Sequence, residues 1–220
     1  MEQIKTGELL EGDDRRFPLA DYFDFDIRPY LSIVTFESDE TILQEGRQPA
    51  FLLYLISGRA KLFISHKNGR ISLINFLNAP CFIGEMELIG AQNAANGITA
   101  ITPCTCYAIP KGVCQEELLH DVKFLRALCL FLGQKALGNT DNYAKNQSYP
   151  LEVRLAKFIL MTAQNNLYRE KHTEVAEYLG VTYRHLLYVL ADFVKRGFLL
   201  KTKQGYRIQQ ADALQKLSGL

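Results

Sequence analysis

Polar and basic side chains between residues 171 and 203 are spaced so that they can bind a polyanion and distinguish its sequence. Tyr183, Arg184 and Tyr188 lie within about one and a half turns of one predicted helix. An arginine can bond guanine through two donors, and a tyrosine can bind phosphate or pack on a thymine methyl group. The residues expected to contact double-stranded DNA are Lys171, His172, Thr173, Thr182, Tyr183, Arg184, His185, Tyr188, Lys201 and Lys203.

Two helices joined by a tight turn are needed to present these side chains. A first helix is predicted from about Thr173 to Leu179, with Thr173 accepting a hydrogen bond from an exposed amide at its start. Ala176 is small enough to let a second helix cross closely. Gly180 suits the left-handed position that ends the first helix, and Thr182 is expected to cap the second.

The second helix is amphipathic and a basic hairpin follows it. Its apolar face comprises Leu186, Leu187, Val189, Leu190 and Phe193. Gly197 ends it, and Phe198–Lys201 and Tyr206–Ile208 flank a turn that contains Lys203. This order of elements predicts a winged helix-turn-helix, with Lys201 and Lys203 placed for phosphates.

The distribution of charge agrees with a DNA-binding C-terminal part. Residues 1–149 contain 14 lysines and arginines against 18 aspartates and glutamates, whereas residues 150–220 contain 11 against 6. The asymmetry favours two domains with the basic one near a polyanion, although a basic face is often only solvated.

Residues 31–110 contain short apolar runs separated by turn residues. Runs such as Phe51–Ile56 and Ile71–Leu77 have the length of strands. Asn68-Gly69 is typical of a two-residue hairpin turn, because both positions favour positive φ. The pattern predicts a compact antiparallel roll or barrel. Residues 1–30, acidic with scattered aromatics, are expected to form short helices that pack on it.

The hydrophobic period changes over residues 113–145, where intervals of four and three predict a long helix. This helix either packs on its own roll or joins a second copy of the chain. We favour the dimer, because a polar residue such as Asn139 on a seam can fix its register. The seam consists of Leu118, Val122, Leu125, Cys129, Leu132, Ala136, Asn139 and Tyr143.

These segments together predict an α+β protein in three parts. Residues 1–112 form an N-terminal antiparallel β-roll with a helical segment before it, and we expect this part to sense a signal. Residues 113–145 form the dimerisation helix. Residues 146–220 form the winged helix-turn-helix.

Cys104 and Cys106 are candidates for further chemistry, because alternate residues of a strand face the same way. With Cys81, Cys114 or Cys129 they could hold an iron–sulfur cluster or form a redox switch. Packing as small hydrophobic side chains is the interpretation we favour. His120 is a further candidate as a haem ligand, but a lone histidine usually faces solvent. No metal site is predicted.

Several classes of protein are disfavoured by what the sequence lacks. It contains no nucleophile elbow, phosphate-binding glycine loop or metalloprotease motif, so an enzyme built on the roll is a secondary hypothesis and a scaffold a third. No run is apolar enough to cross a bilayer, and the polar first residues do not resemble a signal peptide. We therefore expect a cytoplasmic protein that is not an enzyme.

A set of motifs resembles the catabolite activator and fumarate-nitrate regulators, the Crp-Fnr family, over about residues 20–210. One motif is similar to the family's entry into its roll, one to the next strand and turn, one to the start of its effector cassette, and one to the opening helix of its DNA domain. The helix-turn-helix is most similar to that of YeiL-type regulators. The four motifs are Thr41–Gly46, Leu53–Gly58, Phe82–Leu88 and Arg154–Ala156.

The resemblance implies a cyclic-nucleotide-binding-like roll, a homodimer on a two-fold operator and RNA polymerase as a further partner. It also implies a small-molecule effector. Members that bind cyclic nucleotides hold the phosphate with an Arg-Ser pair late in the cassette, whereas residues 93–99 of this chain contain no cation. A buried phosphate would be poorly compensated there, so we expect the signal not to be cAMP. The implied effector contacts are Phe82, Gly84, Glu85, Asn139 and Thr140.

Overall fold

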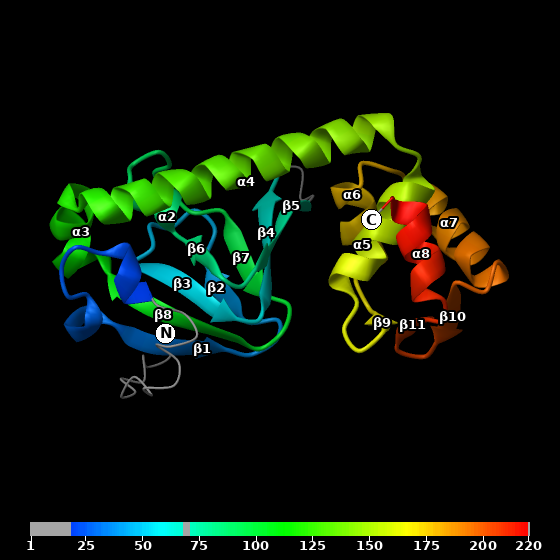
Figure 1. The fold of residues 1–220 in the computed structure, drawn as a ribbon, viewed down its shortest axis with the longest axis horizontal. Helices are drawn as coiled ribbons and strands as arrows, with labels where there is room; N and C mark the ends of the chain where they lie inside the picture. Colours follow the sequence, from blue (N-terminus) through cyan, green and yellow to red (C-terminus); the bar gives the residue numbers. More distant parts are fainter. Residues whose placement is uncertain (1–18, 68–70, 220) are drawn as a thin grey trace. The chain divides into compact units, whose positions relative to one another are not determined.

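The computed structural model describes residues 19–67 and 71–219, and the chain forms two compact units, Met1–Lys135 and Ala136–Leu220. In the first unit, strands β1 to β8 form a roll that is covered on one side by α3 and the first half of α4 (Figure 1). The second unit contains helices α5 to α8 and a small sheet. The predicted turn at Asn68-Gly69 lies outside the described residues.

The first unit contains the antiparallel roll that the sequence predicted. It consists of two sheets with the strand orders β1-β8-β3-β6 and β2-β7-β4-β5. A short helix, α2 (Glu85–Leu88), follows β6. The strands are β1 (Ser32–Phe36), β2 (Thr41–Leu43), β3 (Phe51–Ser57), β4 (Arg59–Ser65), β5 (Ile71–Asn78), β6 (Cys81–Ile83), β7 (Gly97–Ala100) and β8 (Cys104–Pro110).

Strand β3 separates two hydrophobic cores, which explains why its apolar run is nearly continuous. Leu53 and Leu55 face the interior of the roll, while the alternate residues Leu52 and Tyr54 face a second core beneath the helices. Strand residues alternate between the two faces of a sheet, so a strand covered on both faces needs apolar residues throughout. Each fully buried side chain contributes about 1.5–3 kcal/mol to folding.

The segment predicted as one helix over 113–145 is interrupted, and forms α3 (Lys111–His120) and α4 (Val122–Ser148). Asp121 adopts an extended conformation (φ −79°, ψ 106°) that ends α3. Its Oδ1 accepts a hydrogen bond from the backbone N–H of Phe124 (2.9 Å), which is the geometry of a cap on α4. The heptad pattern continues across this break in the sequence, but its neighbouring positions differ in burial, since Leu118 on α3 is fully buried and Val122 on α4 is exposed.

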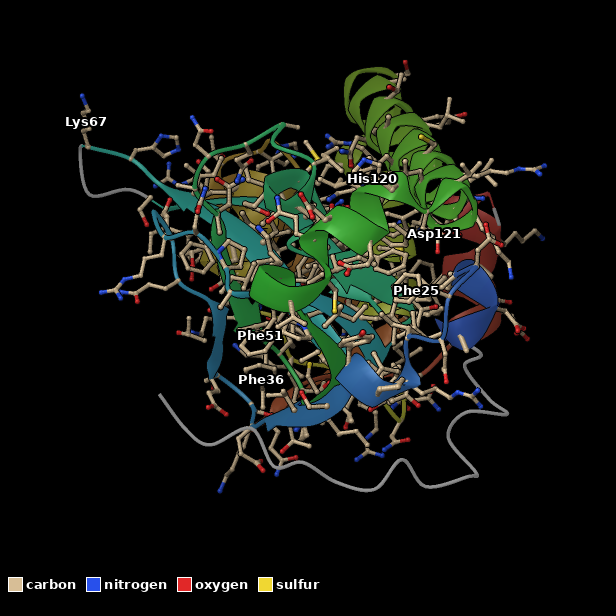
Figure 2. The ribbon with its side chains drawn as sticks, turned by 90° about the vertical axis from the view of Figure 1, so that its left-hand side faces the viewer. Phe25, Phe36, Phe51, Lys67, His120 and Asp121 are labelled. Carbon is tan, nitrogen blue, oxygen red and sulfur yellow. The ribbon has the colours of Figure 1, made fainter. Side chains whose placement is uncertain are left out.

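Asp121 also ties the N-terminal segment to the start of α4. Its Oδ2 accepts a hydrogen bond from the backbone N–H of Asp24 (2.8 Å), and the rings of Phe23 and Phe124 stack with centroids 5.2 Å apart. Figure 2 shows Asp121 beside the segment that carries Phe25. This segment contains two short 3-10 helices, η1 (Leu19–Tyr22) and η2 (Arg28–Tyr30), as expected for its described part.

In the second unit, helices pack around a sheet of strand order β10-β11-β9 (Figure 1). Helix α8 packs on α5, and α6 packs on α7. The helices are α5 (Leu151–Thr162), α6 (His172–Tyr178), α7 (Tyr183–Lys195) and α8 (Ala211–Ser218), and the strands are β9 (Leu167–Tyr168), β10 (Leu199–Thr202) and β11 (Gly205–Ile208).

The substitution Asp121→Ala is expected to lower the free energy of unfolding of the first unit by about 1–3 kcal/mol, because it removes a helix cap and a long-range tether together. Urea unfolding followed by circular dichroism measures the change. Glu116→Ala, on the exposed face of α3, is the matched control and should leave the transition unchanged. Equal stability of the two variants would contradict the role given to Asp121.

Candidate nucleic-acid interface and effector cassette

The turn between α6 and α7 has the predicted glycine geometry. Gly180 adopts φ +64°, and the backbone N–H of Val181 donates to the carbonyl of Ala176 (2.9 Å). Residues other than glycine are strained in this left-handed region. Ala176 is buried, as expected where α6 and α7 cross. The turn therefore fixes the direction in which α7 leaves α6.

Thr182 caps α7 and sets where its exposed face begins. Its Oγ1 accepts a hydrogen bond from the backbone N–H of His185 (3.2 Å), as predicted from the sequence. The expectation that Thr173 caps α6 is wrong. That helix begins at His172, so Thr173 lies inside its first turn, and Lys171, the residue before the helix, makes no side-chain cap. Thr173 and Lys171 are both exposed.

Helix α7 buries its predicted apolar face and exposes the predicted contact residues. Leu186, Val189, Leu190 and Phe193 are buried, with Leu187 half-buried. Tyr183 is 49% exposed and Tyr188 is 72% exposed, which is high for side chains of this size. The exposed positions at the start of the helix are Tyr183, Arg184, His185 and Tyr188.

The exposed face of α7 extends beyond the residues that the sequence analysis identified. Ala191 and Lys195 are exposed and follow Arg184 and Tyr188 at intervals of three and four residues. This spacing keeps them on the same side of the helix. The periodicity that identified the apolar face could also have identified Lys195, which is a further candidate for phosphate contact.

Arg154 anchors the helix-turn-helix to α5. Its guanidinium donates to the carbonyls of Leu179, at the end of α6, and Tyr149. Burial lowers the pKa of Arg154, which nevertheless stays protonated at neutral pH. The sequence marked Arg154 only as part of a motif, because nothing local indicates a contact with a residue 25 positions away.

The hairpin of β10 and β11 exposes both predicted lysines. Lys201 pairs across the strands with Tyr206, and Lys203 lies in the turn. Thr202 Oγ1 donates to the carbonyl of Gly205 (3.0 Å) and so closes the turn. A Cβ on Gly205 would come within 2.2 Å of the Tyr168 carbonyl oxygen, so only glycine fits against β9, a strand that the sequence did not predict.

In the predicted effector cassette, Gly84 adopts φ +86° between β6 and α2. Phe82 is part of the core and packs on Tyr54, with ring centroids 4.8 Å apart. Glu85 is 3% exposed, and its Oε1 lies 2.6 Å from Nζ of Lys135 on α4. The structure therefore gives the Glu85 carboxylate a cation from the same chain, whereas Phe82 is buried in the core beneath the helices.

The other two predicted effector contacts lie on α4 within the second unit. Asn139 and Thr140 have exposed side chains, and Thr140 Oγ1 donates to the carbonyl of Ala136 (3.0 Å). Glu85 and Lys135 belong to the first unit.

Phe63 and the late part of the cassette, residues 93–99, offer few groups that could bind an anion. A Cβ on Gly97 would come within 2.2 Å of the Phe63 ring, so this ring lies directly against the Gly97 backbone. Ala95, which precedes that strand, is buried, and residues 89–110 contain no lysine or arginine.

Cys104 and Cys106 share one face of β8, as predicted, and that face lies in the interior of the roll beside Cys81. Burial raises the pKa of Cys106 and raises the pKa of Cys81 to about 12, so the thiolate forms that bind metals are disfavoured. Across residues 19–67 and 71–219, no three potential ligand side chains are grouped to hold a metal ion. His120 is exposed on α3, where its Nδ1 lies 2.7 Å from the Glu116 carbonyl oxygen.

Comparison with known proteins finds two family profiles in the chain. One, described as "Cyclic nucleotide-binding domain", matches residues 33–121, and the other, described as "Crp-like helix-turn-helix domain", matches residues 153–217. The chain is 48% identical to the regulatory protein YeiL of Escherichia coli over 200 residues, which is 91% of this chain and 90% of that protein. It is 22% identical to a CRP-like cAMP-activated global transcriptional regulator of Mycobacterium tuberculosis, over 84% and 87% of the two chains.

Solved structures with the same fold include other regulators. A Crp/Fnr-family regulator from Eubacterium rectale superposes with a TM-score of 0.78 at 17% identity, over 94% of this chain and all of that one. One from Thermus thermophilus superposes with a TM-score of 0.70 at 18% identity, over 86% and 98%. Within the described part of this chain, no helix is long and apolar enough to cross a membrane.

The substitution Lys135→Met is expected to destabilise the first unit by about 3 kcal/mol, because it leaves the buried Glu85 carboxylate without its cation. The double variant Glu85→Gln/Lys135→Met should recover most of this loss, since it removes both charges. Urea unfolding of Glu85→Gln, Lys135→Met and the double variant gives the interaction energy between the two side chains. Lys67→Met, at an exposed position (Figure 2), is the control. Additive losses in the double variant would show that the pair is not coupled.

Proposed function

Because the chain belongs to the Crp-Fnr family of transcription regulators, we propose that it is a homodimer that binds a two-fold-related DNA operator through α7. The observation that carries this proposal is the exposed start of α7, where Thr182 caps the helix and Arg184 and Tyr188 project from it. In a helix-turn-helix this part of the second helix enters the major groove.

In the proposed complex, base contact and backbone contact come from different elements. Arg184 bonds guanine through two donors, and Tyr183 and Tyr188 pack on neighbouring bases or hold phosphates. Backbone contacts come from residues at the edge of α7, before and within α6, and on the hairpin, which forms the wing. These residues are Lys171, His172, Thr173, Thr182, His185, Lys195, Lys201 and Lys203.

The second copy is proposed to pack on the exposed apolar face of α4. Val122 is 74% exposed, Leu130 is 61% exposed and Leu137 is 73% exposed, which is costly on a helix left in water. Leu130 and Leu137 are seven residues apart, as are Val122 and the exposed Cys129, so the face has a coiled-coil period. Leu125 and Leu132 of the predicted seam are instead half-buried against the roll.

A two-fold dimer would place two copies of α7 in successive major grooves, about 34 Å apart. The roll of residues 1–112 would sense the signal, which we propose is not cAMP, because Lys135 already pairs with Glu85 and the late cassette lacks a cation. RNA polymerase is the proposed further partner, and the cytoplasm the proposed location. We propose no enzymatic activity.

Selection from random-sequence duplexes tests the DNA-binding proposal and supplies the operator. Arg184→Ala should weaken binding to the selected duplex by about 1–3 kcal/mol per half-site and relax its sequence preference. Lys203→Ala should weaken binding to selected and random duplexes alike and reduce the salt slope by about one. Fluorescence anisotropy over a salt series measures both effects. If no sequence is enriched, the proposed function is wrong; if Arg184→Ala binds as the unchanged protein does, Arg184 makes no base contact.

Cysteine cross-linking tests the dimer interface. Cys129 is exposed on the proposed face, whereas Cys81, Cys104, Cys106 and Cys114 are buried. Oxidation with copper phenanthroline should therefore give a covalent dimer on a non-reducing gel, because two copies of Cys129 meet across the two-fold axis. Cys129→Ser should abolish the product, and the control Cys114→Ser should not. A protein that is monomeric by light scattering would contradict the proposal.

A further inference from the structure

His172 lies where three elements of the proposed DNA interface meet. It is the first residue of α6, and its ring packs against Tyr183 of α7 and Tyr206 of β11, with centroids 6.4 Å and 5.7 Å away. Lys201 of β10 stands opposite Tyr206 in the strand register and acts electrostatically on the imidazole. His172 is half-buried.

The surroundings of His172 favour its neutral form in the free protein. The ring is enclosed by the phenols of Tyr183 and Tyr206, and Lys201 adds a positive charge beside it. Burial, and then repulsion by Lys201, lower the pKa of His172 below its ordinary value of 6.5. At neutral pH the free protein therefore presents an uncharged imidazole at a surface where Lys171, Lys201 and Lys203 are exposed.

We propose that His172 takes up a proton from solvent when the protein binds DNA, so that affinity for DNA increases as pH falls. This inference rests on the proposed function, because it needs the surface around α6 and the wing to contact a phosphate backbone. A phosphate beside the imidazole offsets the charge of Lys201 and stabilises the imidazolium. Protonated His172 then adds a charge-assisted hydrogen bond at the junction of α6, α7 and the wing.

The direction of the pH effect follows from linkage. DNA raises the pKa of His172 above its value in the free protein, so the complex holds more protons than its separated components between the two pKa values. Within that interval, each proton taken up increases the affinity by up to about tenfold for every unit by which the pH falls. Above the pKa of the complex, and below the pKa of the free protein, the contribution of His172 no longer changes with pH.

The experiment measures the dissociation constant of the full-length protein for the selected duplex between about pH 5.5 and 8, at constant salt. His172→Gln cannot be protonated, and it should bind with the affinity that the unchanged protein shows at high pH and lose the pH dependence assigned to this residue. His172→Arg is permanently charged, and it should bind with the low-pH affinity throughout. His120→Gln, at an exposed histidine of the first unit, is the matched control and should retain the pH dependence, and His185→Gln measures the share of the other histidine placed at the interface.

A second measurement does not depend on any variant. The pKa of His172, followed by the NMR resonances of its ring, should be higher in the complex with the selected duplex than in the free protein. An unchanged pKa, a pH-independent affinity of the unchanged protein, or a pH dependence that His185→Gln removes and His172→Gln retains would each overturn the inference. Those results leave the proposed function intact, whereas failure to bind any duplex at any pH would overturn both.

Discussion

The left-handed conformation of Gly180 is the constraint on which the proposed interface depends. A Cβ at this position would meet no atom within 4 Å, so the need for glycine arises from its φ of +64° and not from crowding. L-residues pay roughly 1–2 kcal/mol to adopt this conformation. Arg154 holds the same turn from outside through the carbonyl of Leu179. The direction of α7, and with it the position of Arg184, thus depends on one backbone angle and one long-range hydrogen bond.

In the proposed interface, different residues provide the sequence preference and the electrostatic attraction to DNA. The start of α7 presents Arg184 beside two tyrosines, whose rings and hydroxyls offer specific contacts. The lysines stand at the border, before α6 and on the wing, where a charge need not be aligned with a base edge. His172 lies between the two groups. Its packing against Tyr183 and Tyr206 couples the orientation of the wing to that of α7.

Features with a local cause could be predicted from the sequence, and features with a distant cause could not. Gly180 and Thr182 fix a turn and a cap through their own backbone and side chain, and both were predicted. The break at Asp121 was missed, because the apolar period continues from α3 into α4 and the tether to Asp24 spans 97 residues. Strand β9 was missed for a similar reason, since a two-residue strand has no detectable alternation and it joins the sheet by pairing with β11, which is distant in the sequence.

The cassette around Glu85 combines the fold of the cyclic nucleotide-binding domain with an ion pair supplied by α4. Of the effector contacts that the family resemblance implied, Gly84 has a left-handed conformation and Glu85 is buried, and the Glu85 carboxylate is already compensated by Lys135. An effector that bonds Oε1 of Glu85 would therefore compete with a charge-assisted contact of 2.6 Å. Because Lys135 belongs to α4, an effector that displaces it would remove one of several contacts between the first unit and the helix proposed to form the dimer, since Phe124 and Leu128 of α4 are also buried against the roll.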